Sequence, residues 1–267
     1  MALVLEEHAC LDLLEHVVRV VDHGTVSAEC RRNTHAQSIC RGGDAAAAYP
    51  VQAAAGFLAE LSDLPDVSGA PFSFPSRYPD ALQLVRTKMR SFRTTSMGRL
   101  FDTAAALLGF TREITFEGQA AMWLERLASP ATTSDAYPFP FVGDELDFRP
   151  LLDGMIRDRL RGRGEAEMAR AFHRGIAKGL CNAVSTLCRV NEVDTIVLSG
   201  GVFQNELLLH DIKNLLESER LQIWVNHIVP SNDGGISLGQ AALAALGNRR
   251  AHSSIEEAES EWTAQVT

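Results

Sequence analysis

The sequence has no CxxC pair, no long apolar run and no excess of basic residues. Its five cysteines are too widely spaced in 267 residues for a zinc finger or a disulfide framework, which favours a reducing compartment. No apolar stretch approaches the roughly 18 residues that a membrane-spanning helix needs. The amino-terminal segment carries acids where a secretory signal has bases. We therefore expect a cytoplasmic protein without a membrane partner.

The composition also argues against a nucleic-acid partner. Lys and Arg number 25 against 34 Asp and Glu, which gives a formal net charge of −9. Binding nucleic acid without sequence preference needs a basic surface. Hydrophobic residues make up 46% of the chain, which is ordinary for a globular protein. A chain of this length can bury a substantial core, in one large domain or two modest ones.

The first two thirds of the chain predict one hairpin and then mostly helices. Residues 17–30 alternate apolar and polar side chains around His23-Gly24, as a β-hairpin does, whereas residues 3–14 fit either a short helix or a strand. Proline-rich stretches at 62–80 and 130–150 indicate irregular structure. Apolar spacing predicts helices at 50–61, 80–90, 96–108, 117–128, 151–159 and 165–189.

The last third alternates strands with helices. The apolar runs at 194–198 and 221–225 predict buried strands. Each is followed by a glycine-containing loop and a helix, expected at 202–217 and 236–246. This order is typical of an α/β fold with a parallel sheet.

Both glycine-containing loops are expected at the carboxyl ends of strands, where open α/β sheets bind ligands. Gly200 and Gly201 either let an anion approach the backbone and the N–H groups of the following helix, or simply form a tight turn. Asp233 either caps a helix or ligates a divalent cation. Asp102 lies on the polar side of its predicted helix, where its carboxylate is either solvated or turned toward a ribose hydroxyl.

Other candidate side chains are interpreted as structural. Cys181 and Cys188 share one face of a long helix, and His173 lies on the same helix, so we expect core residues rather than nucleophiles. Arg157, Arg159, Arg161 and Arg163 form a basic run that fits either a solvated helix end or a contact for an anion or acidic partner. Nothing in the sequence places a nucleophile beside a base, so no catalytic residue is predicted.

Three groups of motifs together resemble the C-terminal portion of the HypF family of hydrogenase-maturation carbamoyltransferases. They are residues 198–209 with 229–240, residues 96–102 with 116–121, and residues 41–46. The resemblance implies part of an actin-like ATPase fold, mainly the second of two ribonuclease-H-like lobes, with a largely helical insertion. It divides the chain into an atypical segment at 1–16, a partial transferase domain at 17–246 and a flexible acidic tail at 247–267.

The resemblance also implies an activity. The family transfers a carbamoyl group from carbamoyl phosphate, through an ATP-derived carbamoyl-adenylate, to the C-terminal cysteine of HypE, for synthesis of the cyanide ligand of nickel–iron hydrogenases. Residues that match the family's motifs would bind the nucleotide or carbamoyl-adenylate, namely Gly200, Gly201 and Asn205, with Asp102 and Gly118 at the ribose and base. Asp233 would bind a divalent metal such as Fe, Zn or Mg.

The sequence departs from the family pattern in ways that bear on activity. The acylphosphatase-like, zinc-finger and YrdC-like domains are absent, as is the histidine cluster of the first lobe. We therefore expect little or no turnover from this chain alone. One alternative is a non-catalytic truncated paralogue that binds a partner, or itself through the surface left by the missing lobe. Another is a relative of the tRNA threonylcarbamoyl transferases, although Gly98-Arg99 and Phe203-Gln204 favour the hydrogenase branch.

Overall fold

The computed structural model describes residues 2–5, 19–22, 25–28, 38–41, 47–89, 91–143, 145–242 and 244–245. Contacts divide the chain into two units, residues 1–225 and residues 226–267. The predicted tail at 247–267, most of the segment at 1–16 and all but Arg41 of the motif at 41–46 lie outside the described residues. No helix among the described residues is both long enough and apolar enough to cross a membrane.

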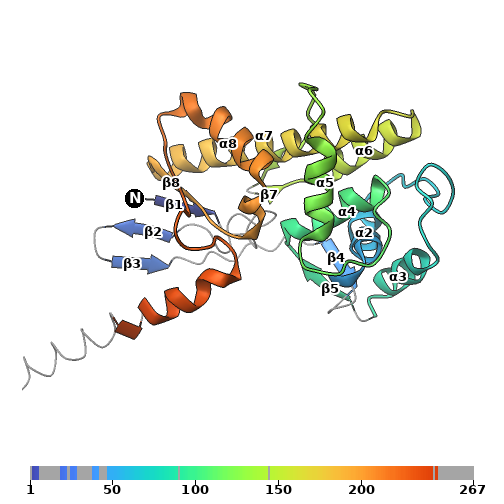
Figure 1. Cartoon of the computed structure of the whole chain (residues 1–267), viewed down its shortest axis with the longest axis horizontal. Coiled ribbons are helices and arrows are strands. Elements are labelled where there is room, and N and C mark those ends of the chain that lie inside the picture. The colour runs from blue at the N-terminus through green and yellow to red at the C-terminus, as the bar shows by residue number, and fades with distance from the viewer. Residues whose placement is uncertain are drawn as a thin grey trace, which may run out of the picture. The chain divides into compact units, whose positions relative to one another are not determined.

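The first unit contains a three-stranded parallel sheet in the order β1-β8-β9. Its strands are β1 (Ala2–Leu5), β8 (Thr195–Leu198) and β9 (Gln222–Val225). Ile196 and Leu198 alternate along β8 and are buried in the same hydrophobic core as residues of α7 and α8, the two helices that lie beside this sheet (Figure 1). The parallel pairing confirms the α/β class, and β1 shows that the segment at 3–14 begins in a strand.

Three antiparallel pairs complete the strands that the structure describes. β2 (Arg19–Asp22) pairs with β3 (Thr25–Ala28), and Asp22 lies opposite Thr25, so the predicted hairpin with a two-residue loop is confirmed. β4 (Ser38–Arg41) pairs with β5 (Ser91–Thr94). β6 (Phe141–Val142) pairs with β7 (Glu145–Leu146). The last two pairings were not predicted.

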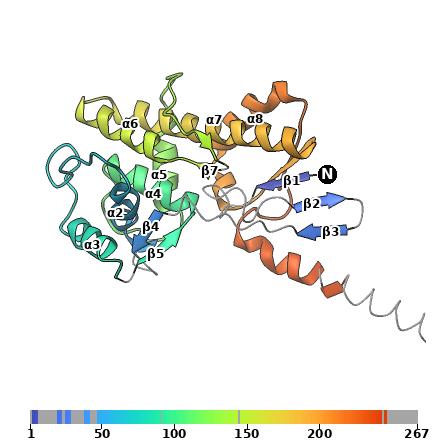
Figure 2. The same cartoon turned by 180° about the vertical axis from the view of Figure 1, so that it is seen from behind.

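The helices of the first unit follow the predicted order and surround one hydrophobic core (Figures 1 and 2). They are α2 (Pro50–Ala59), α3 (Arg77–Arg86), α4 (Met97–Leu107), α5 (Gln119–Ala128), α6 (Arg149–Leu160), α7 (Glu165–Asn191) and α8 (Glu206–Leu216). Pro50 occupies the first turn of α2, and Gly109 follows α4 with a φ of +110°. The prediction for α3 was three residues late at its start and ran past its end at Arg86.

The long helix α7 is the centre of this core. The apolar spacing that predicted this helix puts five side chains on one stripe, and all of them are buried: Phe172, Ile176, Leu180, Val184 and Leu187. Phe172 packs edge-to-face against Phe101 of α4 with 5.0 Å between ring centroids. Cys181 and Cys188 are buried and unpaired. Burial raises the pKa of the Cys181 thiol to about 12 and also raises the pKa of Cys188. Both thiols are therefore core residues, as predicted.

The irregular segment at 130–148 lies against two glycines of α7. The Tyr137 N–H donates to the carbonyl of Ala171 over 3.2 Å, which ties this segment to the helix. A Cβ atom at Gly175 would lie 2.5 Å from the Tyr137 carbonyl oxygen, and one at Gly179 would lie 2.5 Å from that of Phe139. Only glycine therefore lets the two backbones approach this closely.

The predicted helix at 202–217 was wrong at its start. Residues Gly201–Gln204 form a turn of 3-10 helix, Asn205 is extended, and α8 begins at Glu206. The Asn205 side-chain oxygen accepts the N–H of Leu208 over 2.8 Å, so an N-cap separates the two elements. Between Asn205 and β8 lies a separate turn that contains both glycines of the predicted anion site.

Candidate functional site

The turn after β8 has a backbone that requires glycine. Gly200 adopts φ 108° and ψ 159°, a region that side chains with a Cβ atom essentially never occupy. Gly201 begins the 3-10 turn, and the N–H of Phe203 closes it by donating to the Gly200 carbonyl over 3.1 Å. The turn follows the carboxyl end of a parallel strand, which is where ligands of such sheets bind.

The first turn of α8 is already satisfied by protein oxygens. The N–H of Leu208 donates to Asn205 Oδ1, and the N–H of Leu207 donates over 3.1 Å to a carboxylate oxygen of Glu125, which comes from α5. The N–H groups of Leu207 and Leu208 are therefore not free to bind an anion, because side-chain oxygens of the protein already accept them.

Asn205 lies almost entirely inside the protein. Besides capping α8, its side-chain nitrogen lies 3.1 Å from Nε2 of His173, which is itself fully buried in α7. The predicted structural role of His173 is confirmed by this burial. The Glu125 cap and the His173 contact were not predicted, since each joins segments far apart in the sequence. The cap at Asn205 was readable, because asparagine before an apolar run is a common helix start.

Asp102 is buried, so the interpretation of a solvated acid is wrong. The cause is that α4 is covered on all sides, with every residue from Leu100 to Leu107 buried. Asp102 pairs with Arg99 over 2.5 Å, and the same guanidinium nitrogen donates to the carbonyl of Ala47. Burial raises the pKa of Asp102 to about 6, while Arg99 opposes the shift. The carboxylate remains ionised at neutral pH.

Gly118 precedes α5 in a left-handed conformation, with a φ of +76°. It is exposed, and no heavy atom lies within 4 Å of where a Cβ would stand. The adjacent Gln119 uses its side-chain oxygen to accept the N–H of Thr115 over 2.7 Å, which closes the loop before the helix. The helices that carry Asp102 and Gly118 pack against each other within the first unit.

Asp233 belongs to the second unit and begins a 3-10 turn at Asp233–Gly235. The cap of this turn is Asn232, whose side-chain oxygen accepts the N–H of Gly234 over 3.0 Å, and Asp233 itself is exposed. Among the described residues no three His, Cys, Asp or Glu side chains gather to hold a metal ion. One carboxylate is not a metal site, so these residues alone do not fit a bound metal.

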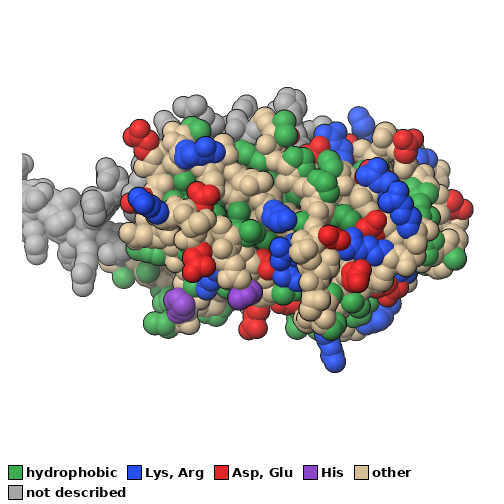
Figure 3. All heavy atoms as spheres, turned by 90° about the horizontal axis from the view of Figure 1, so that it is seen from above, with side chains coloured by type: hydrophobic (Ala, Val, Ile, Leu, Met, Phe, Trp, Pro, Cys, Tyr) green, Lys and Arg blue, Asp and Glu red, His purple; other side chains and the backbone are tan. Residues whose placement is uncertain are grey.

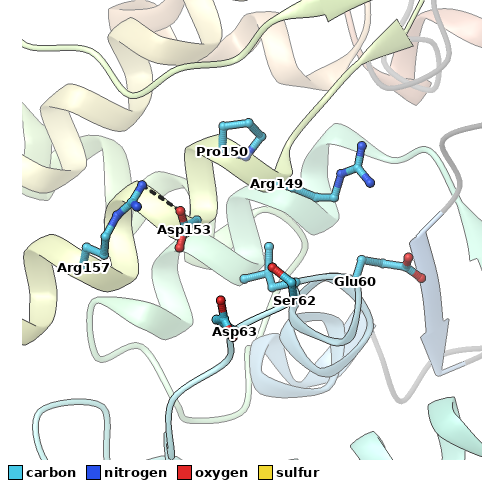
Figure 4. Close-up of a pocket in the computed structure, with 8 residues that line it drawn as sticks. Glu60, Ser62, Asp63, Arg149, Pro150, Asp153 and Arg157 are labelled. Carbon is cyan, nitrogen blue, oxygen red and sulfur yellow. Dashed lines mark ion pairs between the residues drawn. The ribbon is translucent and has the colours of Figure 1, made fainter.

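A polar groove of about 450 Å³ lies between the end of α2 and the start of α6, and it is separate from the predicted site (Figure 4). Its charged side chains are largely paired: Arg157 bonds Asp153 over 2.7 Å, and Arg149 bonds Asp147 beside the groove over 2.8 Å. None of the predicted ligand residues lines it.

Two arginines of the basic run at the end of α6, Arg159 and Arg163, are paired and largely covered, whereas Arg157 and Arg161 are exposed as predicted. Arg163 bonds Asp158 over 2.8 Å and Asp135 over 2.7 Å, and Arg159 bonds Glu165 over 2.5 Å. The two arginine side chains are only 19% and 14% exposed. On the face seen from above α6, α7 and α8, acidic and basic side chains are intermingled (Figure 3). The run therefore makes no concentrated basic patch for an anion.

Comparison with known proteins identifies the family. Residues 25–240 match the model of the carbamoyltransferase Kae1-like domain, second subdomain. The chain is 31% identical over 230 residues to a carbamoyltransferase HypF homolog of Cupriavidus necator, covering 82% of this chain and 58% of that protein. It is 30% identical over 247 residues to carbamoyltransferase HypF2 of the same species, covering 80% of this chain and 30% of that protein.

Solved structures give the same assignment. The chain superposes with a TM-score of 0.68 and 31% identity on full-length HypF in its phosphate- and nucleotide-bound form, covering 78% of this chain and 33% of that one. HypF of T. kodakarensis, at 24% identity, gives a TM-score of 0.69 over 80% of this chain and 29% of that one. The chain therefore belongs to the HypF carbamoyltransferase family. It spans about a third of either solved structure.

Proposed function

We propose that this chain is the part of a HypF carbamoyltransferase that holds carbamoyl-adenylate during transfer to HypE. The supporting observation is its likeness to a HypF structure solved with phosphate and nucleotide, at 31% identity over 78% of this chain. The fold proposed with it is the actin-like ATPase fold, of which this chain supplies mainly the second lobe.

In this proposal the turn after β8 carries the anionic part of the nucleotide. Gly200 and Gly201 let the phosphate approach the backbone, and Asn205 fixes the end of the turn. Asp102 and Gly118 are proposed at the ribose and base. Because Asp102 is buried and paired with Arg99, contact with a ribose requires the hydroxyl to reach the carboxylate edge that Arg99 leaves uncovered.

The transfer step needs no nucleophile from this chain. The cysteine thiolate of HypE attacks the carbamoyl carbon, a C–S bond forms, and the bond from that carbon to the AMP phosphate oxygen breaks as AMP leaves. The protein then contributes by positioning the mixed anhydride and stabilising the negative charge that develops on the leaving phosphate. Backbone N–H groups at a glycine turn are suited to this task.

Asp233 is proposed as one ligand that this chain offers to a divalent metal. The described residues supply no complete set of ligands, so the other ligands would have to come from outside these residues. A bound divalent ion would neutralise phosphate charge.

The activity is tested by complementation. The chain is mixed with labelled carbamoyl phosphate, ATP and HypE, with and without a HypF relative truncated before its matching C-terminal region. We expect label on the HypE cysteine only when both pieces are present. No label with both pieces, or the same label without this chain, would contradict the proposed function. Strong labelling by this chain alone would contradict the expectation that it has little turnover by itself.

A second proposal concerns association with partners. Besides HypE, we propose that the chain binds a second copy of itself, since its first unit exposes large apolar side chains such as Phe116, Met122 and Trp224. Light scattering over a range of concentrations tests this. A mass that rises with concentration is expected, and a constant monomer mass would exclude it.

A further inference from the structure

A buried hydrogen-bond chain connects α7 to the proposed ligand turn. His173 is fully buried, with the ring of Phe101 5.5 Å away and that of Phe172 5.8 Å away, centroid to centroid. Each of its ring nitrogens has one partner. Nδ1 lies 2.8 Å from the carbonyl oxygen of Ala169, and Nε2 lies 3.1 Å from the side-chain nitrogen of Asn205.

These partners allow only one arrangement of protons. A carbonyl oxygen can only accept, so Nδ1 of His173 must carry the hydrogen and donate it. A neutral imidazole has one N–H, which makes Nε2 the acceptor, and the Asn205 side-chain nitrogen donates to it. Asn205 Oδ1 is then the atom that accepts the N–H of Leu208 over 2.8 Å. The tautomer of the histidine thus sets the orientation of the asparagine amide.

Asn205 joins the glycine turn to the helix that follows. Its own N–H donates to the carbonyl of Val202 over 3.2 Å, and its carbonyl accepts the N–H of Leu209 over 3.0 Å. Its side chain caps α8 from within, while Glu125 caps the neighbouring N–H from α5. If the amide rotated, the cap would lose its acceptor, and the turn at 200–204 would lose its fixed end.

We infer that His173 is a positioning residue that, by orienting the Asn205 amide, holds the Gly200–Gly201 turn in the shape that receives the ligand. The identity of the ligand at this turn rests on the proposed function, whereas the positioning of the turn by His173 does not. Two charged groups act on the imidazole, Arg170 and Asp211, and they are paired with each other over 2.5 and 2.7 Å between α7 and α8. Their opposite charges act on it in opposite directions, which suits a neutral imidazole.

The inference is tested first on the wild-type chain, by NMR of the histidine ring nitrogens and of the Asn205 side-chain amide. We expect a neutral ring protonated at Nδ1 from pH 8 to pH 5, and an amide hydrogen coupled to Nε2. A ring protonated at Nε2, or one that titrates near pH 6.5, would overturn the inference. This measurement needs no ligand, so it is independent of the proposed function.

A variant then tests the effect on the turn. His173→Phe keeps the aromatic volume but removes the acceptor for Asn205, and Ile176→Val is the matched control on the same buried helix. We expect the backbone amide resonances of Gly200 and Gly201 to shift in His173→Phe and to stay in place in the control. If these resonances did not shift in a folded His173→Phe variant, His173 would not position the turn.

Nucleotide affinity separates the positioning role of His173 from the proposed binding of nucleotide. If the wild-type chain binds magnesium ATP, His173→Phe should weaken binding about tenfold, the loss that one misplaced hydrogen-bonding group causes. Adding Asn205→Ala to His173→Phe should weaken it little further, because both changes act through one amide. Full affinity in His173→Phe would contradict the inference while leaving the proposed function intact.

Discussion

Two buried titratable side chains, Asp102 and His173, respond to pH in opposite directions. Burial raises the pKa of Asp102 to about 6 from 3.8, so between these values the folded state holds a proton that the unfolded state has lost. The contribution of Asp102 to the free energy of unfolding therefore falls as the pH rises from about 4 to 6. Burial lowers the pKa of His173 to about 4 from 6.5, so its contribution rises over nearly the same range. The two effects largely cancel.

Replacing Asp102 by Asn should expose the contribution of His173. Without the carboxyl, the free energy of unfolding should fall as the pH is lowered from 6.5 to 4, by on the order of 3 kcal/mol, because the unfolded state then gains the histidine proton. Denaturant unfolding at a series of pH values measures this. The control Asp80→Asn, at an exposed position of α3, should follow the wild-type profile. If the free energy of unfolding of Asp102→Asn varied with pH as that of the wild type does, the opposing contributions of Asp102 and His173 would be refuted.

Gly200→Ala should damage the turn itself. The backbone at Gly200 lies where a Cβ atom is strained, so we expect a loss of about 1–3 kcal/mol in stability together with loss of nucleotide binding. The control is Gly69→Ala, at an exposed position outside any helix, where φ is not in the left-handed region and no heavy atom lies within 4 Å of the added Cβ. That control should be neutral or slightly stabilising in thermal unfolding. Equal behaviour of the two variants would show that the turn does not need glycine.

At the scale of elements, the segment at 130–148 depends on the two glycines of α7. Gly179→Ala improves helix propensity by about 1 kcal/mol, but its Cβ would lie 2.5 Å from the Phe139 carbonyl oxygen. We expect a net destabilisation of about 1–3 kcal/mol and faster proteolysis within 130–148, because the segment must move away from the helix. Lys178→Ala, at an exposed neighbouring position, is the control. A stabilised Gly179→Ala variant would show that the segment moves without cost.

The sequence predicted elements whose signals are local and missed those that depend on distant segments. The stripe of α7, the hairpin at β2 and β3 and the strand at β8 follow from periodicity or turn residues. The pairing of β4 with β5 joins residues about fifty positions apart, and no local pattern encodes it. The start of α8 was placed too early because the apolar run Val202-Phe203 hid the Asn205 cap.

The same distinction holds for the candidate site. Gly200 and Gly201 were identified from the sequence because a glycine pair after a buried strand is a local signal. The burial of Asp102 was missed, since it depends on the helices that pack around α4. The contacts of Glu125 and His173 with the residues around Asn205 likewise join positions 32 or more apart. Helical periodicity can place a side chain on a face but cannot say what covers that face.

At the scale of the whole molecule, the chain matches only part of the length of its relatives. The chain spans 30% of HypF2 and 58% of the HypF homolog of Cupriavidus necator. It contains the glycine turn in its first unit and Asp233 in its second. Under the proposed function these residues hold the ligand, whereas we expect turnover to need other parts of the relatives as well.

The most direct test of the account is thermal unfolding of the chain with increasing magnesium ATP. A ligand that binds only the folded state raises the melting temperature as its concentration passes the dissociation constant. We predict such a rise for the wild type and a smaller one for Asp233→Ala, with Asp80→Ala matching the wild type. An unchanged melting temperature of the wild type at millimolar nucleotide would contradict the central claim that this chain holds the nucleotide.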